Sequence, residues 1–399
     1  MLSYEKNFAP RGDGRYVCTM AAQMARVRDM KMTLALPEVL DGESLEQWKK
    51  AIREKLVELL DMPAPTPQPE PKHLSTVQRE GYRVEKWEFY PDDYTAVPFL
   101  ALIPDEAGAE KPVPGVMCFL GSNHNKEFVA GEPQIDHPNC LVSRYPDRNR
   151  MAKYYVENGM AAFVFDNPAI GETSVMGDPA FGENQSYSRV QLCAGYLRFG
   201  LNYLAVSVSQ KLCFMDQFLC KLPYVDQKRI AVSGHSLGTE VGIMLSVLRD
   251  DIAAMVFNDC ITDGARRFAG ITEEPENHMS QDIGNWHTVP GMLKHFGLTE
   301  LCAAFAPKPL GLTEGAGDAG LETIRRAYEA AGAADQLLVS YYPAYRDPAT
   351  RNKPGPMPWY GMTEKDYFDH NYIDAPDHSF RKDPALDFLK RCFYKKTNY

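Results

Sequence analysis

A Gly-x-Ser-x-Gly pentad constrains the fold of this chain more than any other stretch. It runs from Gly234 to Gly238 with Ser236 at its centre, and it directly follows the short apolar run 230–232. After the pentad, apolar residues recur every three to four positions, as they do on one face of a helix. Strand, tight turn and helix in this order are typical of a nucleophile elbow, in which a serine hydroxyl projects from the carboxyl edge of a sheet. Glycine is needed on both sides of the serine because a β-carbon there would collide with the adjoining strand or helix.

Beyond residue 71, segments whose apolar residues are spaced as in β-strands alternate with segments whose apolar residues are spaced as in helices. Residues 82–90 and 95–103 predict an antiparallel hairpin joined by a short turn. Further strands are expected at 113–120, 160–165, 253–257, 309–313 and 337–342, and helices at 147–158, 204–219, 321–331 and 384–393. This alternation predicts an α/β fold with a mostly parallel sheet, covered by helices on both faces, and with the hairpin as its antiparallel edge.

The first 70 residues are organised differently. An apolar stripe between residues 45 and 59 predicts a helix, and the proline-rich segment 63–71 after it reads as an extended, semi-rigid connector. We therefore expect residues 1–70 to form a helical accessory region that packs onto a catalytic domain formed by residues 71–399.

Three segments of the expected catalytic domain are too long to be simple connections. They cover residues 121–146, 260–306 and 343–380, and each follows the end of a strand. Open α/β sheets bind ligands at that edge, so we expect these insertions to shape a binding site.

Composition excludes several classes of function. The formal charge of −10, without a stretch rich in lysine or arginine, argues against a nucleic-acid partner. No apolar run approaches the length of a membrane span, and the first residues lack the apolar core of a secretory signal, so we expect a cytoplasmic protein with no membrane partner. A secreted protein whose signal had been removed would show the same pattern, so this alternative stays open. The nine cysteines are scattered and the histidines lack ligand spacing, which favours reduced thiols and predicts no metal and no cofactor. The sequence leaves the oligomeric state open.

A serine nucleophile needs a base to take its proton and a carboxylate to orient that base. In folds with this elbow the chain order is serine, acid, histidine, so the base should lie between the last strand and the last helix. His370 and His378 both qualify. We favour His378, because it lies close to the start of the last helix, and keep His370 as the second candidate.

The acid is expected after the strand at 309–313. Asp318 is favoured because it lies where a strand-to-helix loop turns back, from which its carboxylate could reach the imidazole. Two further carboxylates stay open as the acid. They are Glu314, which this strand boundary places at the strand end, and Asp259, directly after the strand at 253–257.

The oxyanion of an acyl-transfer intermediate needs two N–H donors aimed at it. The first should be the backbone N–H of Leu237, directly after the serine. The second should come from the loop after the strand at 113–120, with Ser122 favoured over Asn123. Gly121 would let this loop approach the site closely.

On these motifs the chain resembles the α/β-hydrolase superfamily and, within it, the dienelactone-hydrolase-related, acetyl-xylan-esterase-like branch. The resemblance covers about residues 44–395 and is carried by 233–240, Phe257-Asn258-Asp259, Asp166-Asn167 with Gly171-Glu172, Thr313-Glu314-Gly315 with Asp318, and Asp377-His378. It implies hydrolysis of carboxylic esters, including acetyl groups on polysaccharides or oligosaccharides, with a small-molecule or oligosaccharide ester as substrate. The chain departs from many relatives by having Leu120-Gly121 where they carry His-Gly.

Three functions are compatible with the sequence. The leading hypothesis is a serine esterase that works through an acyl-enzyme. A prolyl-oligopeptidase-like serine peptidase would use the same residues, but such enzymes usually carry a gating domain larger than 70 residues. The third is a non-catalytic binding protein that keeps the α/β-hydrolase fold, against which the intact order of serine, acid and histidine argues.

Overall fold

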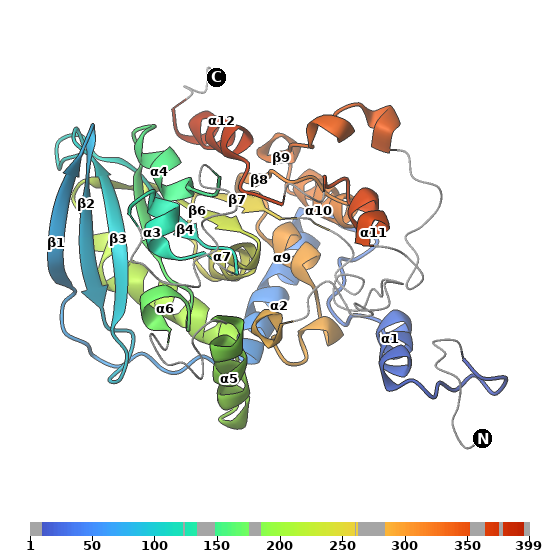
Figure 1. Ribbon diagram of the computed structural model, residues 1–399. Helices are drawn as coiled ribbons and strands as arrows, with labels where there is room; N and C mark the ends of the chain where they lie inside the picture. The colour runs from blue at the N-terminus through green and yellow to red at the C-terminus, as the bar shows by residue number, and fades with distance from the viewer. Residues whose placement is uncertain are drawn as a thin grey trace.

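A single mixed sheet forms the centre of the molecule (Figure 1). The computed structural model describes residues 10–122, 124–133, 148–174, 185–259, 261, 284–351, 364–374 and 378–394. Within them nine strands lie in the order β1-β2-β3-β5-β4-β6-β7-β8-β9. Their bounds are β1 Lys72–Arg79, β2 Tyr82–Phe89, β3 Val97–Pro104, β4 Val113–Phe119, β5 Ala161–Phe165, β6 Val225–His235, β7 Ala254–Asn258, β8 Leu310–Leu312 and β9 Leu337–Val339. From β5 to β9 neighbours pair in parallel, and β1, β2, β3 and β5 pair antiparallel, so the predicted sheet with an antiparallel edge is confirmed.

The antiparallel edge contains the predicted hairpin and one strand that the sequence did not predict. β2 and β3 pair along their whole length, from Tyr82 opposite Pro104 to Phe89 opposite Val97. β1 pairs with the outer edge of β2. Nearly all of its residues are exposed, on whichever face of the sheet their side chains lie. A strand with no buried face does not need alternating apolar residues, and for this reason the apolar pattern of the sequence does not predict β1.

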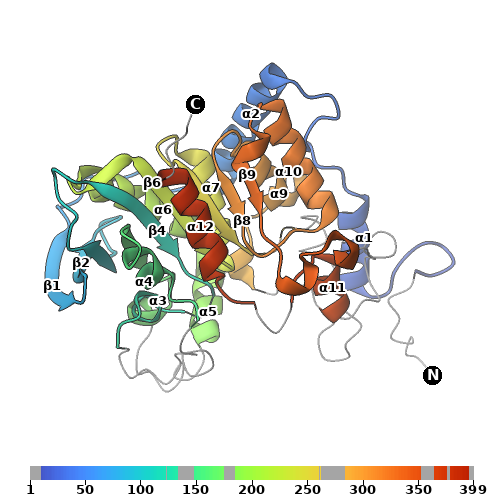
Figure 2. The same cartoon turned by 90° about the horizontal axis from the view of Figure 1, so that it is seen from above.

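Helices cover both faces of the sheet (Figure 2). One layer consists of α2 (Gly42–Leu60), α6 (Tyr203–Gln217), α7 (Leu237–Leu248), α9 (Leu298–Ala304) and α10 (Asp318–Ala330), and the other of α3 (Lys126–Ala130), α4 (Met151–Val156) and α12 (Lys382–Phe393). In β4, Met117 and Phe119 pack into the first layer, while Val116 and Cys118 pack into the second. Burial on both faces explains why this strand reads as a continuous apolar run.

The remaining helices lie around this core or are single turns. They are α1 (Thr19–Asp29), α5 (Gln185–Arg198), α11 (Glu364–His370) and the 3-10 turns η2 (Gly171–Thr173), η3 (Leu219–Lys221), η4 (Asn285–His287), η5 (Met292–Lys294), η6 (Ala334–Gln336), η7 (Pro343–Tyr345) and η8 (Pro348–Arg351). No helix in the described ranges is long and apolar enough to cross a membrane. The insertion at 260–306 thus contains α9, and that at 343–380 contains α11, although 260, 262–283, 352–363 and 375–377 lie outside the described residues.

The helix predicted near residues 45–59 is α2, and its apolar stripe joins the main core. Its first turn is capped by Asp41, whose carboxylate accepts the Ser44 N–H at 2.8 Å while the Ser44 hydroxyl oxygen accepts the Asp41 N–H at 2.9 Å. The stripe is fully or almost fully buried and consists of Leu45, Trp48, Ile52, Leu56 and Leu60. These side chains belong to the same apolar cluster as the sheet residues of the first layer. The division of the chain at residue 70 stays a prediction.

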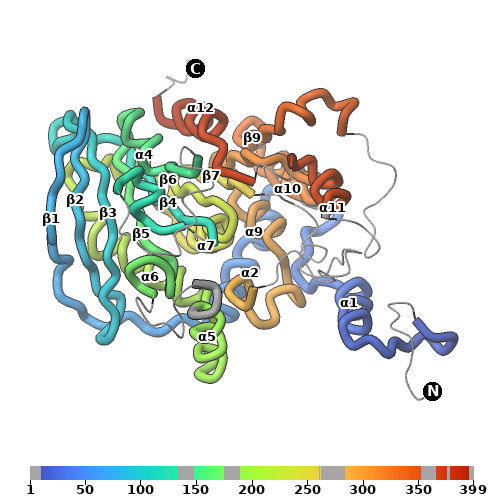
Figure 3. Tube along the Cα trace, viewed as in Figure 1, coloured from blue at the N-terminus to red at the C-terminus, as the bar shows by residue number. Residues whose placement is uncertain are grey.

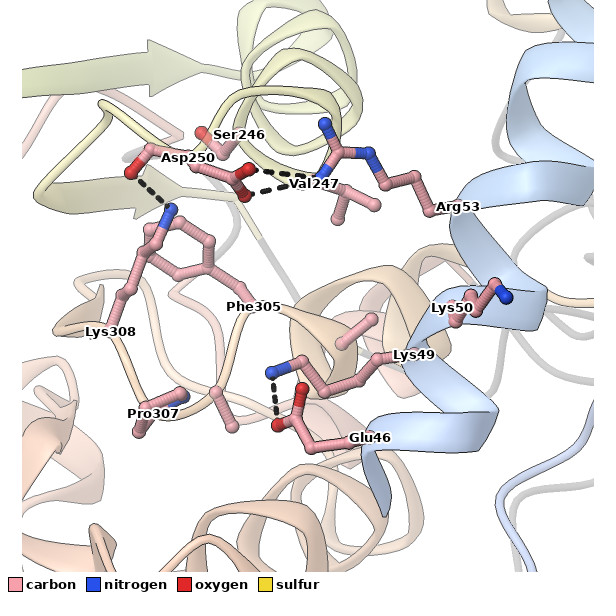
Figure 4. A pocket seen from close by; sticks show the side chains of 12 residues that line it. Glu46, Lys49, Lys50, Arg53, Ser246, Val247, Asp250, Phe305, Pro307 and Lys308 are labelled. Carbon is pink, nitrogen blue, oxygen red and sulfur yellow. Dashed lines mark hydrogen bonds and ion pairs between the residues drawn. The ribbon is translucent and has the colours of Figure 1, made fainter. Parts of the chain in front are cut away.

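Polar contacts also hold α2 against the body of the molecule (Figure 4). Arg53 donates to the Asp250 carboxylate at 3.1 Å and to the carbonyl oxygen of Leu248 at 2.7 Å, and Lys308 donates to the Asp250 carbonyl at 3.0 Å. A cavity of about 250 Å³ lies between these groups. Its walls come from α2, the end of α7, the end of α9 and the loops before β7 and β8. Because these loops lead into the amino ends of β7 and β8, the cavity lies at the opposite edge of the sheet from Ser236.

The connection after α2 is long and extended. Residues 61–71 run from α2 to β1 at the far edge of the sheet (Figure 3). Five prolines in this segment favour an extended backbone, which allows few residues to span that distance.

Replacing Ile52 by alanine should lower the free energy of unfolding by about 2–4 kcal/mol, because a fully buried side chain leaves a cavity between α2 and the sheet layer. Val57 lies on the same helix with 49% of its surface exposed, and Val57→Ala should change stability by less than about 0.5 kcal/mol. Urea denaturation of both variants tests this. Equal effects would show that α2 does not contribute to the core.

Candidate active site

Ser236 occupies a tight turn between strand and helix. β6 ends at His235 and α7 begins at Leu237, so Ser236 alone makes the turn, with φ 51° and ψ −125°. A non-glycine residue rarely adopts a positive φ, and such strain is concentrated at functional sites. The Ser236 N–H donates to the carbonyl oxygen of Asn258 at 3.1 Å, which fixes the turn to the end of β7.

The two glycines of the pentad are required by backbone contacts. A β-carbon on Gly234 would lie 2.6 Å from the carbonyl oxygen of Gly238, and one on Gly238 would lie 2.2 Å from the carbonyl oxygen of Phe119. Both distances are far below van der Waals contact. The spacing of the pentad therefore reflects the close approach of β6, α7 and β4 around the serine.

The imidazole of His378 is paired with a buried carboxylate. Nδ1 of His378 lies 2.9 Å from Oε1 of Glu314, whose side chain is completely buried, whereas 36% of the His378 side chain is exposed. The Tyr342 hydroxyl donates to the same Glu314 oxygen, and the Asn258 amide donates to the other oxygen at 3.2 Å. The carboxylate is thus fixed from several sides, and a partly open imidazole can meet a substrate.

Asp318, the acid favoured from the sequence, does not take this place. β8 ends at Leu312, so Glu314 already lies beyond the strand, at the carboxyl edge of the sheet. Gly315, with φ 81°, then turns the chain, and Asp318 becomes the first residue of α10. Its carboxylate accepts a hydrogen bond from the Tyr372 hydroxyl at 2.7 Å. The structure therefore favours Glu314 over Asp318 as the acid.

His370 and Asp259, the remaining candidates for the base and the acid, lie at the ends of other elements. His370 is the last residue of α11, and its Nδ1 lies 2.8 Å from the carbonyl oxygen of Asp366 in the same helix. Asp259 is buried directly after β7, but the carboxylate that meets His378 Nδ1 is that of Glu314. The geometry favours His378 over His370 as the base.

Asn258, at the end of β7, has an amide whose orientation is fixed by its partners. Its Oδ1 accepts the backbone N–H of Arg381 and the hydroxyl of Thr313, both at 2.8 Å. Because a backbone N–H can only donate, this atom must be the oxygen, and Nδ2 must be the donor.

The Asn258 Nδ2 group then connects the parts of the site. It lies 3.0 Å from Nδ1 of His235, 3.2 Å from Glu314 Oε2 and 3.1 Å from the carbonyl oxygen of Ser379. With its own carbonyl accepting from Ser236, Asn258 joins the nucleophile, the acid and the histidine loop. We infer that it is a positioning residue, a role that the sequence did not indicate, since Asn258 appeared there only within the Phe257-Asn258-Asp259 motif of the resemblance.

Three imidazoles lie together beside the serine. The His235 ring is 4.9 Å from the His378 ring and 5.9 Å from the His124 ring, measured between centroids. Burial, reinforced by the charge of His378, lowers the pKa of His235 well below its usual range and that of His124 to about 4. An unfolded chain would bind these protons below about pH 6.5, so both histidines make the folded state less stable as the pH falls from there towards 4.

One group of side chains among the described residues has the spacing of a metal site. His235, Glu314 and His378 offer ligand atoms within 4.8 Å of one another. Hydrogen bonds already account for their arrangement, since Glu314 accepts from Tyr342 and Asn258, and Nδ1 of His235 accepts from Asn258. We therefore interpret the group as an acid–base pair with a neighbouring neutral imidazole.

The loop after β4 reaches the nucleophile, as the position of Gly121 predicted. A β-carbon on Gly121 would lie 3.5 Å from the β-carbon of Ser236. Leu237, expected to supply the first oxyanion donor, is the first residue of α7, where backbone N–H groups have no partner within the helix. Asn123, the second choice for the other donor, lies outside the described residues.

Two side chains hold the loop after β4 by its carbonyl groups. Asn167 Nδ2 donates to the carbonyl oxygens of Leu120 at 3.2 Å and Gly121 at 3.3 Å. Arg189, a buried residue of α5, donates to the carbonyl oxygen of Ser122 at 2.5 Å. With their carbonyls held in this way, Gly121 and Ser122 have a fixed backbone, which leaves Ser122 as a proposed second donor.

A buried ionic cluster supports the same loop from behind. Lys126, at the start of α3, is fully buried, and its Nζ lies 2.8 Å from Asp166 and 2.6 Å from Glu172. The Lys126 backbone N–H also donates to Asp166 at 2.8 Å. These bonds tie the loop after β4 to the loop after β5. The sequence marked Asp166 and Glu172 only as residues that carry the resemblance to α/β-hydrolases.

The fold and the site together define an α/β-hydrolase. A sequence profile of the Abhydrolase family matches residues 3–391, and the chain therefore belongs to this family. A candidate acetyl xylan esterase from Bacteroides fragilis is similar over 96% of this chain and 97% of its own, with 31% identity and a TM-score of 0.86. A glucuronoyl esterase from Solibacter usitatus is similar in fold, with 14% identity, a TM-score of 0.53 and coverage of 91% of this chain and 96% of its own. No match was found among curated protein sequences.

Proposed function

We propose that this protein is a serine esterase that cleaves carboxylic esters through an acyl-enzyme. The observation that supports this most is the connection of Ser236, on its strained turn, through Asn258 to the hydrogen-bonded pair of His378 and Glu314. A hydroxyl, a partly exposed imidazole and a buried carboxylate in this arrangement are the parts that acyl transfer requires.

In the first half of the proposed reaction, His378 takes the proton of the Ser236 hydroxyl as Oγ attacks the carbonyl carbon of the ester. The carbonyl electron pair moves to its oxygen, which the Leu237 N–H stabilises. The intermediate then collapses, and the alcohol leaves with the proton from His378. Glu314 keeps the His378 proton on Nδ1 in the resting state and stabilises the imidazolium that forms.

In the second half, water attacks the acyl-enzyme while His378 takes one of its protons. The acid leaves as the bond to Ser236 breaks, and His378 returns the proton to Oγ. Every proton is passed between substrate, water and His378, so the residues in the site complete the cycle.

We further propose that the substrates are esters of carbohydrates, and that acetyl esters are the preferred class among them. Support comes from the Bacteroides fragilis relative, which is described as a candidate acetyl xylan esterase and shares 31% identity with nearly the whole chain. Such a substrate needs only the serine, base and oxyanion donors together with a site that accepts a sugar alcohol.

The proposal predicts that the enzyme hydrolyses p-nitrophenyl acetate and releases acetate from acetylated xylo-oligosaccharides, but does not cleave alanyl-prolyl p-nitroanilide. Enzyme treated beforehand with a fluorophosphonate serves as the control, because phosphonylation of Ser236 should abolish both activities. Cleavage of the anilide at a comparable rate would instead favour a peptidase. A chain that neither reacts with the fluorophosphonate nor hydrolyses esters would be a binding protein.

A further inference from the structure

His124 lies in the loop after β4, and its neighbours determine where its proton lies. Oδ1 of Asn149 accepts the backbone N–H of Phe380, which can only donate. The other amide atom of Asn149 is therefore the NH₂ group, and it lies 3.3 Å from Nε2 of His124. Nε2 must accept this hydrogen bond, so a neutral His124 carries its proton on Nδ1.

The Nδ1–H group of His124 is a buried donor without a partner. Nδ1 is closed off from solvent, and no hydrogen-bond acceptor reaches it within the part of the chain that the structure describes. Burial and the charge of His378 lower the pKa of His124 to about 4, so the ring is neutral at neutral pH. Buried donors are usually paired in native proteins, and an unpaired one near a reactive serine points to a ligand atom that completes it.

This nitrogen and the nucleophile border the same small space. A β-carbon placed on Gly121 would lie 3.3 Å from Nδ1 of His124 and 3.5 Å from the β-carbon of Ser236. The same β-carbon would lie only 3.1 Å from Cδ2 of His235, so glycine at position 121 leaves this point between the three residues unoccupied. A group bound against Ser236 can therefore come within reach of the His124 N–H.

The His124 ring is also held in place. It stacks against Phe128 at 5.0 Å and against His235 at 5.9 Å between ring centroids. Asn149, which fixes its Nε2, has a strained φ of 65° and bonds to a residue two positions after His378. A rigid, neutral donor needs no reorganisation when charge develops opposite it, which is the property of an effective oxyanion donor.

We propose that His124 is a catalytic residue whose Nδ1–H donates a hydrogen bond to the ester carbonyl oxygen as this becomes an oxyanion. The inference rests on the proposed esterase function. As Oγ of Ser236 bonds to the carbonyl carbon, the carbonyl electron pair moves to oxygen, where the Nδ1–H of His124 joins the N–H of Leu237 and the N–H proposed above for Ser122 as a donor. His124 keeps its proton throughout, and the proton from Ser236 goes to His378.

The test is steady-state hydrolysis of p-nitrophenyl acetate by three variants of the full chain. His124→Phe keeps the stacked ring and removes the donor, so kcat should fall by about 10²- to 10³-fold with KM nearly unchanged. His124→Asn can place an amide N–H close to the former Nδ1, and His124→Gln places its amide near the former Nε2. We expect His124→Asn to be at least about tenfold faster than His124→Gln, since only Asn offers a donor to the oxyanion.

Circular dichroism and thermal denaturation establish that each variant is folded, and the Asn and Gln pair decides the question if His124→Phe does not fold. A kcat of His124→Phe close to that of wild type would overturn the proposal. A raised KM with unchanged kcat would also overturn it, because that would place His124 in ground-state binding. Equal rates for the Asn and Gln variants would count against it as well. Wild-type enzyme without esterase activity would instead refute the proposed function itself, so the two failures are distinguishable.

Discussion

The Ser236→Ala variant is expected to lose about 10⁴- to 10⁶-fold in kcat towards an acetyl ester while unfolding at nearly the wild-type temperature. Alanine keeps the β-carbon, so it keeps the strained backbone at φ 51° and creates no cavity. The bond from the Ser236 N–H to Asn258 involves only the backbone and also stays. Only the attacking oxygen is lost, so activity and stability should separate almost completely. Ester hydrolysis and thermal denaturation on the same preparation measure both.

Ser246→Ala is the matched control for this variant. Ser246 lies on α7, the same helix that begins after the elbow, and its hydroxyl donates to the carbonyl oxygen of Gly242 at 2.7 Å. Removing that hydroxyl should leave the rate within about twofold, since the bond is made within the helix and away from the turn. Substantial residual activity in Ser236→Ala, beyond the background of the buffer, would mean that another group is the nucleophile.

The secondary structure could be predicted from the sequence wherever burial against the core requires apolar residues in a run or at regular spacing. β4 and β5 appear as continuous apolar runs because both of their faces are covered, and α10 appears as an apolar stripe. β1 could not be found, because it is exposed on both faces. α5 was also missed: it exposes Val190 and Leu197, so no single apolar stripe marks it. Strands and helices that bury few side chains show no regular spacing of apolar residues in the sequence, so they are not predicted.

The site could be predicted only in part, for a related reason. Ser236 and Leu237 were chosen from the spacing of the pentad, and His378 from its place before the last helix; their catalytic roles stay predictions. The acid depended on where β8 ends. The apolar pattern extended that strand to residue 313, but the structure ends it at Leu312 and leaves Glu314 at the sheet edge. A shift of one or two residues, which is the usual uncertainty of such boundaries, therefore changed the choice between Glu314 and Asp318.

Partners that are distant in the sequence could not be predicted at all. Asn258 and Arg381 are joined by a hydrogen bond across 123 positions, and Asn149 and Phe380 across 231. No periodicity or motif spacing in the sequence indicates such a pair, because the two residues meet only when folding brings the carboxyl ends of several strands together. The positioning residues of the site are of this kind.

The Glu314→Gln variant is expected to lose about 10³- to 10⁴-fold in kcat with little change in KM. Glutamine nearly matches glutamate in shape, and its carbonyl oxygen could still accept from Tyr342 or Asn258. It carries no charge, however, so it cannot stabilise the imidazolium of His378. Its NH₂ group can also donate to Nδ1 of His378, and the neutral imidazole would then carry its own proton on Nε2. Nε2 is the nitrogen that must accept the proton of the Ser236 hydroxyl. Both effects act in the transition state, so steady-state kinetics should show them in kcat.

Asp318→Asn distinguishes the two carboxylates by the same chemical change. The Asp318 side chain accepts from the Tyr372 hydroxyl at 2.7 Å, and asparagine can keep that bond through its own oxygen. We expect its kcat to stay within about threefold of wild type, because this residue begins α10 and has no part in the proposed proton transfer. If Asp318→Asn were the inactive variant and Glu314→Gln the active one, the loop after β8 would have to rearrange during catalysis. The acid would then be the one that the apolar pattern favoured. A large loss in Glu314→Gln alone would instead mean that the carboxylate two positions after the end of the three-residue strand β8 orients the base.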